Sequence, residues 1–379
     1  MARRALLLTN DFPPTSGGIA GYLFGLWSHL DRARTAVVAP RVPGAQEFDR
    51  THDVRVYRRR LLWSVRFPVD KLARIVASLA VTPRILRAER TQILHAGHVL
   101  TSGVAALVLK RTLGVPYAVY GYGADLTDYA QYPGVSRLRR RVLREAEGVV
   151  TISNFSVEAL RREGVDEGRI VKVLMGIDTA RFRPDVDRDA IRRRHGLGDR
   201  PVLLTVARLV ERKGHDVVIR ALQQIRQKRR ETVYLVVGAG PERARLERLA
   251  AEIGVGRSVI FTGFVADEDV PAYYAACDVF VLCSRQVGTN FEGGGNVSLE
   301  ASASARPVVV GRSGGTGEHV LHGETGLLVD PTDPDDVAAA VLALLDDRAE
   351  AARLGRRGRE LVEDRFVWDK TVAPMERLL

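Results

Sequence analysis

Short apolar runs alternate with longer segments of helical periodicity along the whole chain, most clearly in its second half. Six apolar runs predict strands there, at Val202–Ala207, Val233–Val237, Val259–Thr262, Val279–Leu282, Pro307–Val310 and Gly326–Val329. Apolar residues at helical spacing predict helices between and after them, at Asp216–Gln227, Glu242–Ile253, Asp335–Leu345 and Ala349–Glu363. Because this alternation is typical of parallel sheets covered by helices, we expect an α/β protein.

A polar segment between Asp178 and Asp199 interrupts the alternation. It is rich in Arg and Asp and contains Pro184, as interdomain connections often are. A length of 379 residues also suits two α/β domains better than one. We therefore expect an N-terminal Rossmann-like domain over residues 1–178, a connection over 179–198, a C-terminal Rossmann-like domain over 199–363 and a final segment over 364–379.

The composition is that of a folded protein, with 46% hydrophobic and 27% charged residues. The opening apolar run, Ala5–Leu8, is too short for a signal peptide and predicts a first strand. No apolar stretch approaches the roughly 20 residues needed to span a bilayer. The two cysteines are too few for a disulfide framework, and no His/Cys spacing suggests zinc. We expect reduced thiols and a cytoplasmic protein.

The net charge of +11 resides in the first half of the chain. Residues 1–178 hold 27 Arg and Lys against 16 Asp and Glu, whereas residues 179–379 hold 30 of each. The segment Arg55–Arg90 alone carries ten basic and two acidic residues. Such a patch attracts acidic lipid headgroups or a phosphorylated acceptor; the alternative is a solvated surface in an arginine-rich protein. No nucleic-acid-binding motif accompanies the charge, so no nucleic acid partner is expected.

The segment from Glu292 to Glu300, Glu-Gly-Gly-Gly-Asn-Val-Ser-Leu-Glu, combines the groups that a nucleotide sugar requires. Its glycines let the backbone approach a ligand closely. A helix that begins near Gly295 would direct free N–H groups and its positive dipole end at a phosphate. The two carboxylates suit a ligand with hydroxyls at both ends. The alternative is a glycine-rich loop between a solvated and a helix-surface glutamate.

Two cations and several glycines follow other predicted strands. Arg208 ends a strand and Lys213 lies in the next loop, where parallel sheets bind their ligands. Both would neutralise a pyrophosphate and stabilise a departing nucleoside diphosphate. The glycines of Gly238-Ala-Gly240-Pro and of Gly314-Gly315 could serve the same ligand, or could simply form tight strand-to-helix turns.

Together these motifs resemble the large retaining glycosyltransferase family four, which is of GT-B type. The likeness spans essentially the whole chain, and its opening is similar to that of phosphatidylinositol mannosyltransferases that use GDP-mannose. The motifs that carry it include Thr9-Asn-Asp-Phe-Pro-Pro, Thr151-Ile-Ser-Asn154, Gly176-Ile-Asp178, Arg208-x4-Lys213, Gly238-x-Gly240-Pro, the Glu-x7-Glu at 292–300 and Gly323-Glu-Thr-Gly-Leu-Leu-Val.

The resemblance implies a role for each motif residue. Glu292 would contact the donor hexose, Glu300 the ribose hydroxyls, and Arg208 with Lys213 the pyrophosphate. The final segment would return to the first domain, and Arg, Lys and a helix dipole would replace a metal ion. The remaining donor-binding positions would be Gly17, Gly18, Gly240, Val265, Gly294, Gly295, Asn296 and Val297. The Asp185-Val-Asp187 sequence lies in the predicted connection and is expected to be solvated.

The chain departs from the family pattern in its first half. Where the family often has His-Gly-x-Asp/Glu, this chain has Tyr122-Gly-Ala-Asp125. If Tyr122 holds the position of that histidine beside the transferred sugar, it can hydrogen-bond but does not titrate near neutral pH; otherwise it is a packed aromatic. His95 and His98 could face the acceptor together with Asp125, or be structural histidines. The usual aromatic of the donor loop is replaced by Gly294.

We therefore expect a retaining, metal-independent hexosyltransferase. Its donor would be GDP-mannose, a UDP-hexose or a UDP-N-acetylhexosamine, and its acceptor the hydroxyl of a lipid-linked or small molecule. Two alternatives stay open: a nucleotide-sugar 2-epimerase, which converts donor without acceptor, and a non-catalytic module that binds anionic membranes. Peripheral association with the inner face of the cell membrane would follow from the basic patch.

Overall fold

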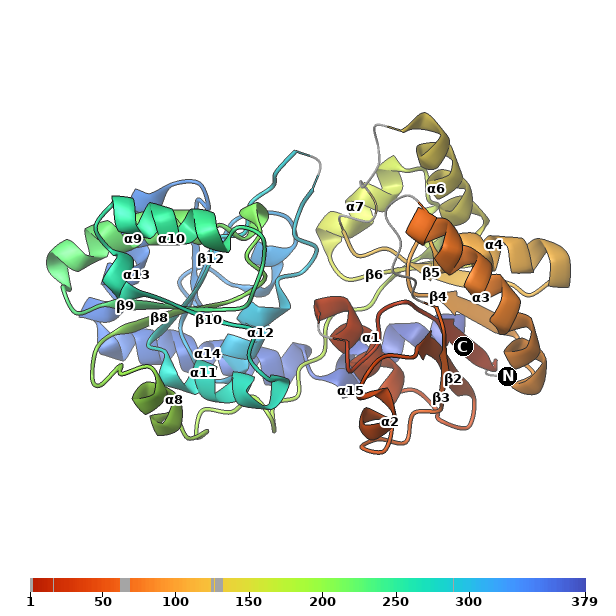
Figure 1. Cartoon of the computed structure of the whole chain (residues 1–379), viewed down its shortest axis with the longest axis horizontal. Helices are drawn as coiled ribbons and strands as arrows, with labels where there is room; N and C mark the ends of the chain where they lie inside the picture. Colours follow the sequence, from red (N-terminus) through yellow and green to blue (C-terminus); the bar gives the residue numbers. More distant parts are fainter. Residues whose placement is uncertain (1–2, 16, 62–68, 124–125, 127–131, 289) are drawn as a thin grey trace. The chain divides into compact units, whose positions relative to one another are not determined.

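The computed structural model describes residues 3–15, 17–61, 69–123, 126, 132–288 and 290–379 (Figure 1). The chain divides into two compact units. The first unit comprises Met1–Gly176 and Trp368–Leu379, and the second comprises Ile177–Val367. Each unit is built on one sheet whose paired strands are all parallel, so the predicted α/β architecture is confirmed.

The sheet of the first unit has the strand order β3-β2-β1-β4-β5-β6-β7. Its central strands are buried along their full length, which is why they appear in the sequence as continuous apolar runs. The predicted first strand is β1. The strands are β1 (Ala5–Leu8), β2 (Thr35–Pro40), β3 (Val56–Arg59), β4 (Ile93–Ala96), β5 (Tyr117–Tyr120), β6 (Gly148–Thr151) and β7 (Ile170–Lys172).

Helices cover both faces of this sheet (Figure 1). The last residues of the chain belong to the same unit, because the backbone N–H of Arg3 donates to the carbonyl of Leu379 over 2.7 Å. Trp368 packs so closely on Gly25 that a Cβ there would lie 2.1 Å from its ring. The helices are α1 (Gly18–Ser28), α2 (Ala45–Phe48), α3 (Val69–Ala88), α4 (Ser102–Leu113), α6 (Pro133–Glu145), α7 (Asn154–Arg162), η1 (Glu167–Arg169), α15 (Trp368–Thr371) and η6 (Ala373–Leu378).

The sheet of the second unit has the strand order β10-β9-β8-β11-β12-β13. Each strand predicted in this half is present, and its ends differ from the prediction by no more than one residue. The strands are β8 (Val202–Val206), β9 (Val233–Val237), β10 (Val259–Gly263), β11 (Val279–Leu282), β12 (Val308–Gly311) and β13 (Leu327–Val329).

The helices of the second unit lie on both faces of its sheet, and α9, α10 and α13 form one of the layers (Figure 1). The four helices predicted in this half are present as α9, α10, α13 and α14. The helices are α8 (Asp189–Arg194), η2 (Glu211–Lys213), α9 (His215–Lys228), α10 (Arg243–Glu252), η3 (Gly256–Ser258), η4 (Asp267–Asp269), α11 (Val270–Ala276), α12 (Asn296–Ala303), η5 (Thr316–His319), α13 (Pro334–Asp346) and α14 (Arg348–Arg365).

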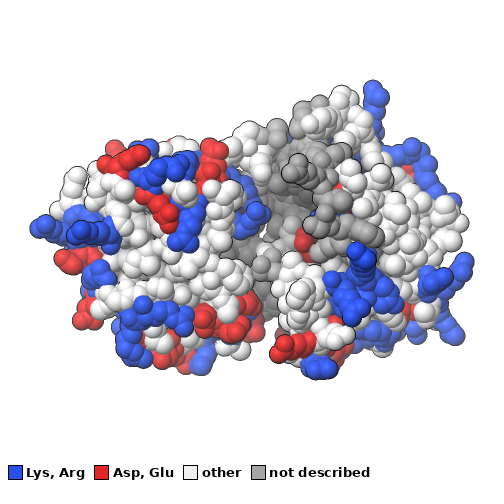
Figure 2. Space-filling model, in the orientation of Figure 1, with Lys and Arg blue, Asp and Glu red and all other residues white. Residues whose placement is uncertain are grey.

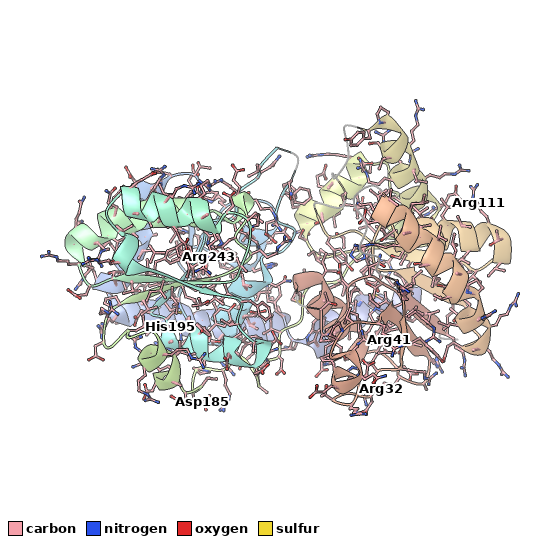
Figure 3. All side chains as sticks on the ribbon, viewed as in Figure 1. Arg32, Arg41, Arg111, Asp185, His195 and Arg243 are labelled. Atoms are coloured by element: carbon pink, nitrogen blue, oxygen red, sulfur yellow. The ribbon has the colours of Figure 1, made fainter. Side chains whose placement is uncertain are left out.

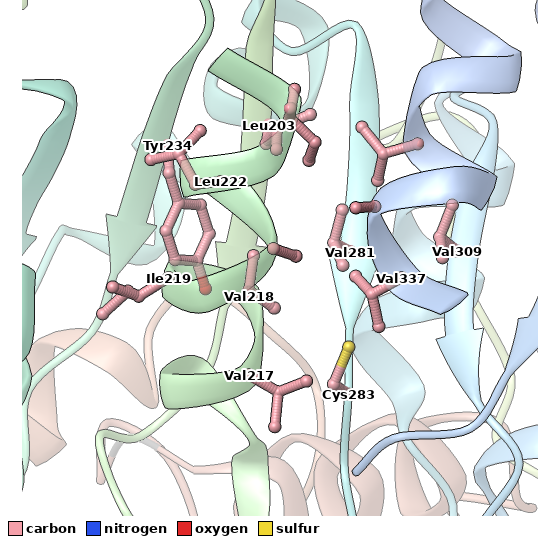
Figure 4. Packing of buried hydrophobic residues seen from close by; sticks show 14 of the residues in the cluster. Leu203, Val217, Val218, Ile219, Leu222, Tyr234, Val281, Cys283, Val309 and Val337 are labelled. Atoms are coloured by element: carbon pink, nitrogen blue, oxygen red, sulfur yellow. The ribbon is translucent and has the colours of Figure 1, made fainter. Parts of the chain in front are cut away.

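The core of the second unit lies between the sheet and this helical layer. Val281 of β11, Val218 of α9 and Val337 of α13 meet there (Figure 4). Tyr234 is also fully buried, and its hydroxyl donates to Oγ1 of Thr205 over 2.8 Å. Both cysteines are buried and unpaired, as expected. Burial raises the pKa of the Cys283 thiol to about 12, so this thiol stays protonated and unreactive at neutral pH.

The segment 179–198, predicted as an interdomain connection, is instead part of the second unit, which begins at Ile177. Arg192 of α8 is buried and donates to the carbonyls of Ala276 over 2.6 Å and Arg200 over 2.7 Å. The polar residues of this segment therefore include a buried arginine that binds backbone oxygens, in addition to residues at the surface. Asp185 is exposed, as expected (Figure 3).

The strand orders define where ligands are expected in each unit. In both sheets the order of the chain reverses next to the first strand, between β1 and β4 and between β8 and β11. Open parallel sheets bind ligands at this switch point, beyond the carboxyl ends of the strands. The loops that leave β8 and β11 there carry Lys213 and Glu292, and those that leave β1 and β4 carry Asp11 and His98.

Candidate active site

The second unit brings Glu292 into direct contact with two cations. Lys213 Nζ lies 2.6 Å from Glu292 Oε2, and Arg212 Nη1 contacts the same oxygen. The side chains of Glu292 and Lys213 are only 13% and 12% exposed. Burial acts to raise the pKa of Glu292, but the charges of Lys213 and Arg212 outweigh it and lower the pKa below its ordinary value. Glu292 is therefore a carboxylate at neutral pH.

The backbone of the glycine loop is fixed by residues from the β12–β13 connection. The N–H of Gly315 donates to the carbonyl of Glu292 over 2.9 Å, and His319 Nε2 contacts the carbonyl of Gly294. Burial lowers the pKa of His319, so its neutral imidazole can donate this hydrogen bond. Gly295 has φ +64°, and a Cβ there would lie 2.7 Å from Thr316 Cγ2. A non-glycine residue would thus displace the loop.

Helix α12 begins directly after this loop. The side chains of Asn296 and Val297 at its first turn are half-buried. Among the described residues, Oδ1 of Asn296 is buried without a hydrogen-bond partner. A buried polar atom of this kind usually finds a partner in a ligand or in ordered water. The N-terminus of α12 also offers free N–H groups and a positive dipole end, which suit an anion.

Glu300 lies further along α12 and is bound by a tyrosine. The hydroxyl of Tyr274 donates to Glu300 Oε2 over 2.7 Å. Burial raises the pKa of Glu300 to about 7, although the bond from Tyr274 and the charge of Arg181 act to lower it. Tyr274 is itself packed between the rings of Phe182 and Phe280. Glu300 is therefore held in one orientation by an aromatic cluster.

The other predicted donor residues of this unit differ in their surroundings. Arg208 is exposed at the end of β8 and half-buried Val265 follows β10, so both are accessible to a ligand. A Cβ on Gly240 would lie 2.3 Å from the carbonyl oxygen of Leu209. Close packing of backbone on backbone is thus one reason for a glycine at this position.

The first unit places an acid and a base in contact at its own switch point. His98 Nε2 lies 2.8 Å from Asp11 Oδ2. Burial acts to raise the pKa of Asp11, but the hydrogen bond and charge of His98 lower it below its ordinary value. The ring of Tyr122 packs edge-on against that of His98, with centroids 6.3 Å apart. Tyr122 is only 6% exposed, which favours the packed aromatic among the two roles that the sequence left open.

The four other site residues predicted in this unit differ in their surroundings. Gly17 is exposed with φ +145°, where a Cβ would meet no atom within 4 Å, and Gly18 begins α1. The backbone at Gly17 is therefore open to a ligand. His95 is fully buried in β4, 3.3 Å from the hydroxyl of Tyr120, and burial lowers its pKa to about 3. This burial favours the structural alternative for His95. Asp125 lies outside the described residues.

Sequence reasoning did not assign roles to several residues of these clusters. Asp11 stands in the Thr-Asn-Asp-Phe-Pro-Pro motif and Arg212 precedes Lys213, so their positions gave a local signal. Tyr274 and His319 gave none, because they reach Glu300 and Gly294 only through the fold. Within the described ranges, no group of three or more His, Cys, Asp or Glu residues could hold a metal ion. None of the described helices is long and apolar enough to cross a bilayer.

Two family profiles match nearly the entire chain. The profile described as Glycosyltransferase Family 4 matches residues 16–181, and that described as Glycosyl transferases group 1 matches residues 187–361. The chain belongs to glycosyltransferase family four. The glycosyltransferase is 36% identical to the GDP-mannose-dependent alpha-(1-6)-phosphatidylinositol monomannoside mannosyltransferase of Mycolicibacterium smegmatis, over 99% of this chain and 97% of the relative. The family prediction is therefore confirmed.

More distant similarities support the same architecture. The glycosyltransferase is 31% identical to the 2-deoxystreptamine glucosyltransferase of Streptomyces kanamyceticus, over 69% of this chain and 70% of the relative. Among solved structures, it is similar to the Anabaena protein HepE in complex with UDP-glucose, with a TM-score of 0.84, 22% identity and 99% of both chains covered. The fold is GT-B, with two Rossmann-like domains, as predicted from the sequence.

Proposed function

We propose that this glycosyltransferase transfers mannose, with retention of configuration and without a metal ion, from GDP-mannose to a hydroxyl of a phosphoinositide-type lipid. The contact of Lys213 with Glu292 at the β8/β11 switch point carries the donor-binding part of the proposal. The contact supports the proposal because a cation could bind a diphosphate and the adjacent ionised carboxylate could bind sugar hydroxyls. The choice of donor and acceptor is supported by the name of the 36% identical relative.

The residues of the second unit suggest how each part of the donor is bound. Arg208, Lys213 and the N-terminus of α12 would hold the diphosphate and stabilise the charge that develops as it departs. Glu292 would accept hydrogen bonds from the hexose, and Glu300 from the ribose. We propose that the acceptor hydroxyl gives its proton to the departing phosphate oxygen on the same face of the sugar. The new glycosidic bond then forms on that face, which retains the configuration.

The first unit offers a basic pocket that suits an anionic acceptor. A cavity of about 560 Å³ is lined by Arg41, Arg50 and Arg58 together with one acidic residue, Glu47, and Arg58 is paired with Asp49. Arg41 directly follows β2 (Figure 3). Lys and Arg predominate on the face of the first unit in Figure 2, whereas both charges are interspersed over the second. A phosphodiester headgroup fits such a pocket, and a cationic aminocyclitol, the kind of acceptor named for the Streptomyces relative, fits poorly.

The experiment that tests this function is nucleoside diphosphate release from a panel of GDP- and UDP-sugars, with a chelator present. The panel is run without acceptor, with phosphatidylinositol mannoside and with 2-deoxystreptamine. We expect GDP release only from GDP-mannose with the lipid, and an α-linkage in the product by NMR. Glu300→Ala should remove most of the signal, whereas Glu350→Ala, an exposed glutamate of α14, should not.

Each other outcome of the panel contradicts part of the proposal. Turnover with 2-deoxystreptamine alone would overturn the lipid acceptor, and loss of activity that only added metal restores would overturn metal independence. Conversion of the donor into another sugar nucleotide without acceptor would indicate an epimerase. Absence of saturable nucleotide binding would overturn the donor site as a whole and favour a binding module.

We further propose that the protein associates peripherally with the inner face of the cell membrane through α3. Val69, Leu72 and Val76 lie on one side of this helix at helical spacing and are 57%, 62% and 57% exposed. The same helix carries Lys71 and Arg87, and the basic segment Arg55–Arg90 contains it. Exposed apolar side chains flanked by cations favour the surface of an anionic bilayer.

Sedimentation with liposomes tests this association. We expect binding to vesicles that contain phosphatidylinositol or phosphatidylserine, weaker binding to neutral vesicles, and a loss of binding in Leu72→Gln. Leu138→Gln serves as the matched control, since Leu138 is 38% exposed on α6. Sedimentation that does not depend on lipid charge, or an equal effect of both substitutions, would contradict the proposal.

A further inference from the structure

The closest contacts of Glu292 both fall on one of its two carboxylate oxygens. Both Arg212 Nη1 and Lys213 Nζ contact Oε2. Among the described residues, no hydrogen bond reaches Oε1. One oxygen thus holds the side chain in place, and the other stays available to a ligand. The two cations that share Oε2 are an ammonium and a guanidinium. Only Lys213 belongs to a family motif, Arg208-x4-Lys213, that implies a role for it.

The backbone of Arg212 is tied to the strand that leads to Glu292. The N–H of Arg285, three residues after β11, donates to the carbonyl of Arg212 over 2.8 Å. The guanidinium of Arg285 in turn makes two hydrogen bonds of 2.9 Å to the two carboxylate oxygens of Asp216, in the first turn of α9. The backbone bond ties the β11 loop to η2, and the bidentate pair ties it to the start of α9. Arg212 is therefore presented to Glu292 by a rigid frame.

We propose that Arg212 is a positioning residue, which keeps hold of Glu292 Oε2 when the diphosphate of the donor draws Lys213 away. Oε1 then stays directed at the hexose throughout binding. This inference deepens the proposed function and rests on it. Its physical basis is that an ammonium on a flexible stem reorients readily towards a phosphate, whereas a guanidinium holds a carboxylate in a fixed geometry.

Charge balance explains why a second cation is needed. Glu292 is largely buried, and a buried carboxylate that loses its only partner is strongly destabilised. The described charged groups in contact with it are Arg212 and Lys213, while His319 acts on the same loop through the carbonyl of Gly294. Once Lys213 turns to the diphosphate, Arg212 remains as the cation on Oε2. Without Arg212 the pKa of Glu292 should rise, and the carboxylate should lose its orientation.

The test compares Arg212→Gln with Arg212→Lys in the full-length protein. For Arg212→Gln we expect kcat to fall about 10- to 100-fold while the donor KM changes less than about threefold, as for loss of a charged hydrogen bond. The acid limb of the kcat profile should move up by about one pH unit. Arg212→Lys keeps the charge and should leave the acid limb in place. Arg245→Gln is the control, because Arg245 pairs with Glu242 and approaches Asp216 only to 4.0 Å.

Three outcomes would overturn the inference. The first is an Arg212→Gln variant with wild-type kcat and acid limb, and the second is a loss confined to donor KM. The third concerns the Arg212→Lys variant, which decides the matter if Arg212→Gln does not fold. It is a shift of the acid limb of the kcat profile by a full pH unit although the charge is retained. Failure of the proposed function looks different, because the wild-type protein itself would then bind no nucleotide sugar.

Discussion

The two units share the order of six strands, to which the first unit adds β7, but they present different chemistry at the same topological position. In the second unit, Lys213 and Glu292 meet 2.6 Å apart at the β8/β11 switch point, with Arg212 on the same oxygen. In the first unit, Asp11 and His98 meet 2.8 Å apart at the β1/β4 switch point. The sheet therefore decides where side chains converge, and the loops decide what they can bind. A surplus of cations suits a diphosphate, whereas an acid–imidazole pair suits hydroxyl groups.

The largest effect is expected from Glu292→Gln in the second unit. The substitution keeps the shape of the side chain but removes the charge that Lys213 and Arg212 balance. We expect kcat/KM to fall about 100- to 1,000-fold, roughly 3–4 kcal/mol, as for loss of one electrostatic contact in a transition state. Nucleoside diphosphate release measures this, with exposed Glu350→Gln as control. A decrease in kcat/KM of less than tenfold would contradict a role for the Glu292 carboxylate in transfer.

An intermediate effect is expected on stability, from Glu300→Gln. Because the folded pKa of Glu300 is about 7, above its ordinary 4.5, its stabilising contribution is complete below about pH 4.5 and is lost as the pH rises through 7. Between pH 5 and pH 8, the free energy of unfolding of the wild-type protein should therefore fall by roughly 1–3 kcal/mol relative to that of Glu300→Gln. Chemical unfolding at both pH values measures the difference. A difference that does not change with pH would show that Glu300 titrates normally.

The smallest effect on donor binding is expected from Asp11→Asn in the first unit. The substitution keeps a side chain next to His98 but removes the charge of the pair. If this unit serves the acceptor, transfer should slow about tenfold, while donor affinity stays within about twofold of wild type. Calorimetric titration with the donor nucleotide, together with transfer rates, separates the two effects. Asp53→Asn is the control, since Asp53 is an exposed partner of Arg32. An equal decrease in donor affinity and in transfer rate would contradict the proposed difference between the two units.

The second unit was the more predictable of the two. Its six strands and the four helices predicted with bounds agree with the structure to within two residues, because buried parallel strands are continuous apolar runs and these helices have a clear apolar face. Helices α8 and α11 were not predicted. The residues Arg208, Lys213, Glu292 and Glu300 stand in short motifs, so local sequence was enough to propose them as site residues. The first unit carries fewer motifs, and its site depends on contacts between distant loops. His95 illustrates the limit: a histidine at a strand end gives no sign of whether it faces the core or a ligand.

What the sequence determined by itself was the alternation of elements, the family and the motif residues, since each depends on neighbours within a few positions. The fold alone decided which of them touch. Lys213 and Glu292 are 79 positions apart, and Asp11 and His98 are 87 apart, yet each pair is in contact. Tyr274 reaches Glu300, and His319 reaches the carbonyl of Gly294, only through the tertiary structure. Side-chain contacts of this kind follow from strand order and helix packing, which local periodicity does not encode.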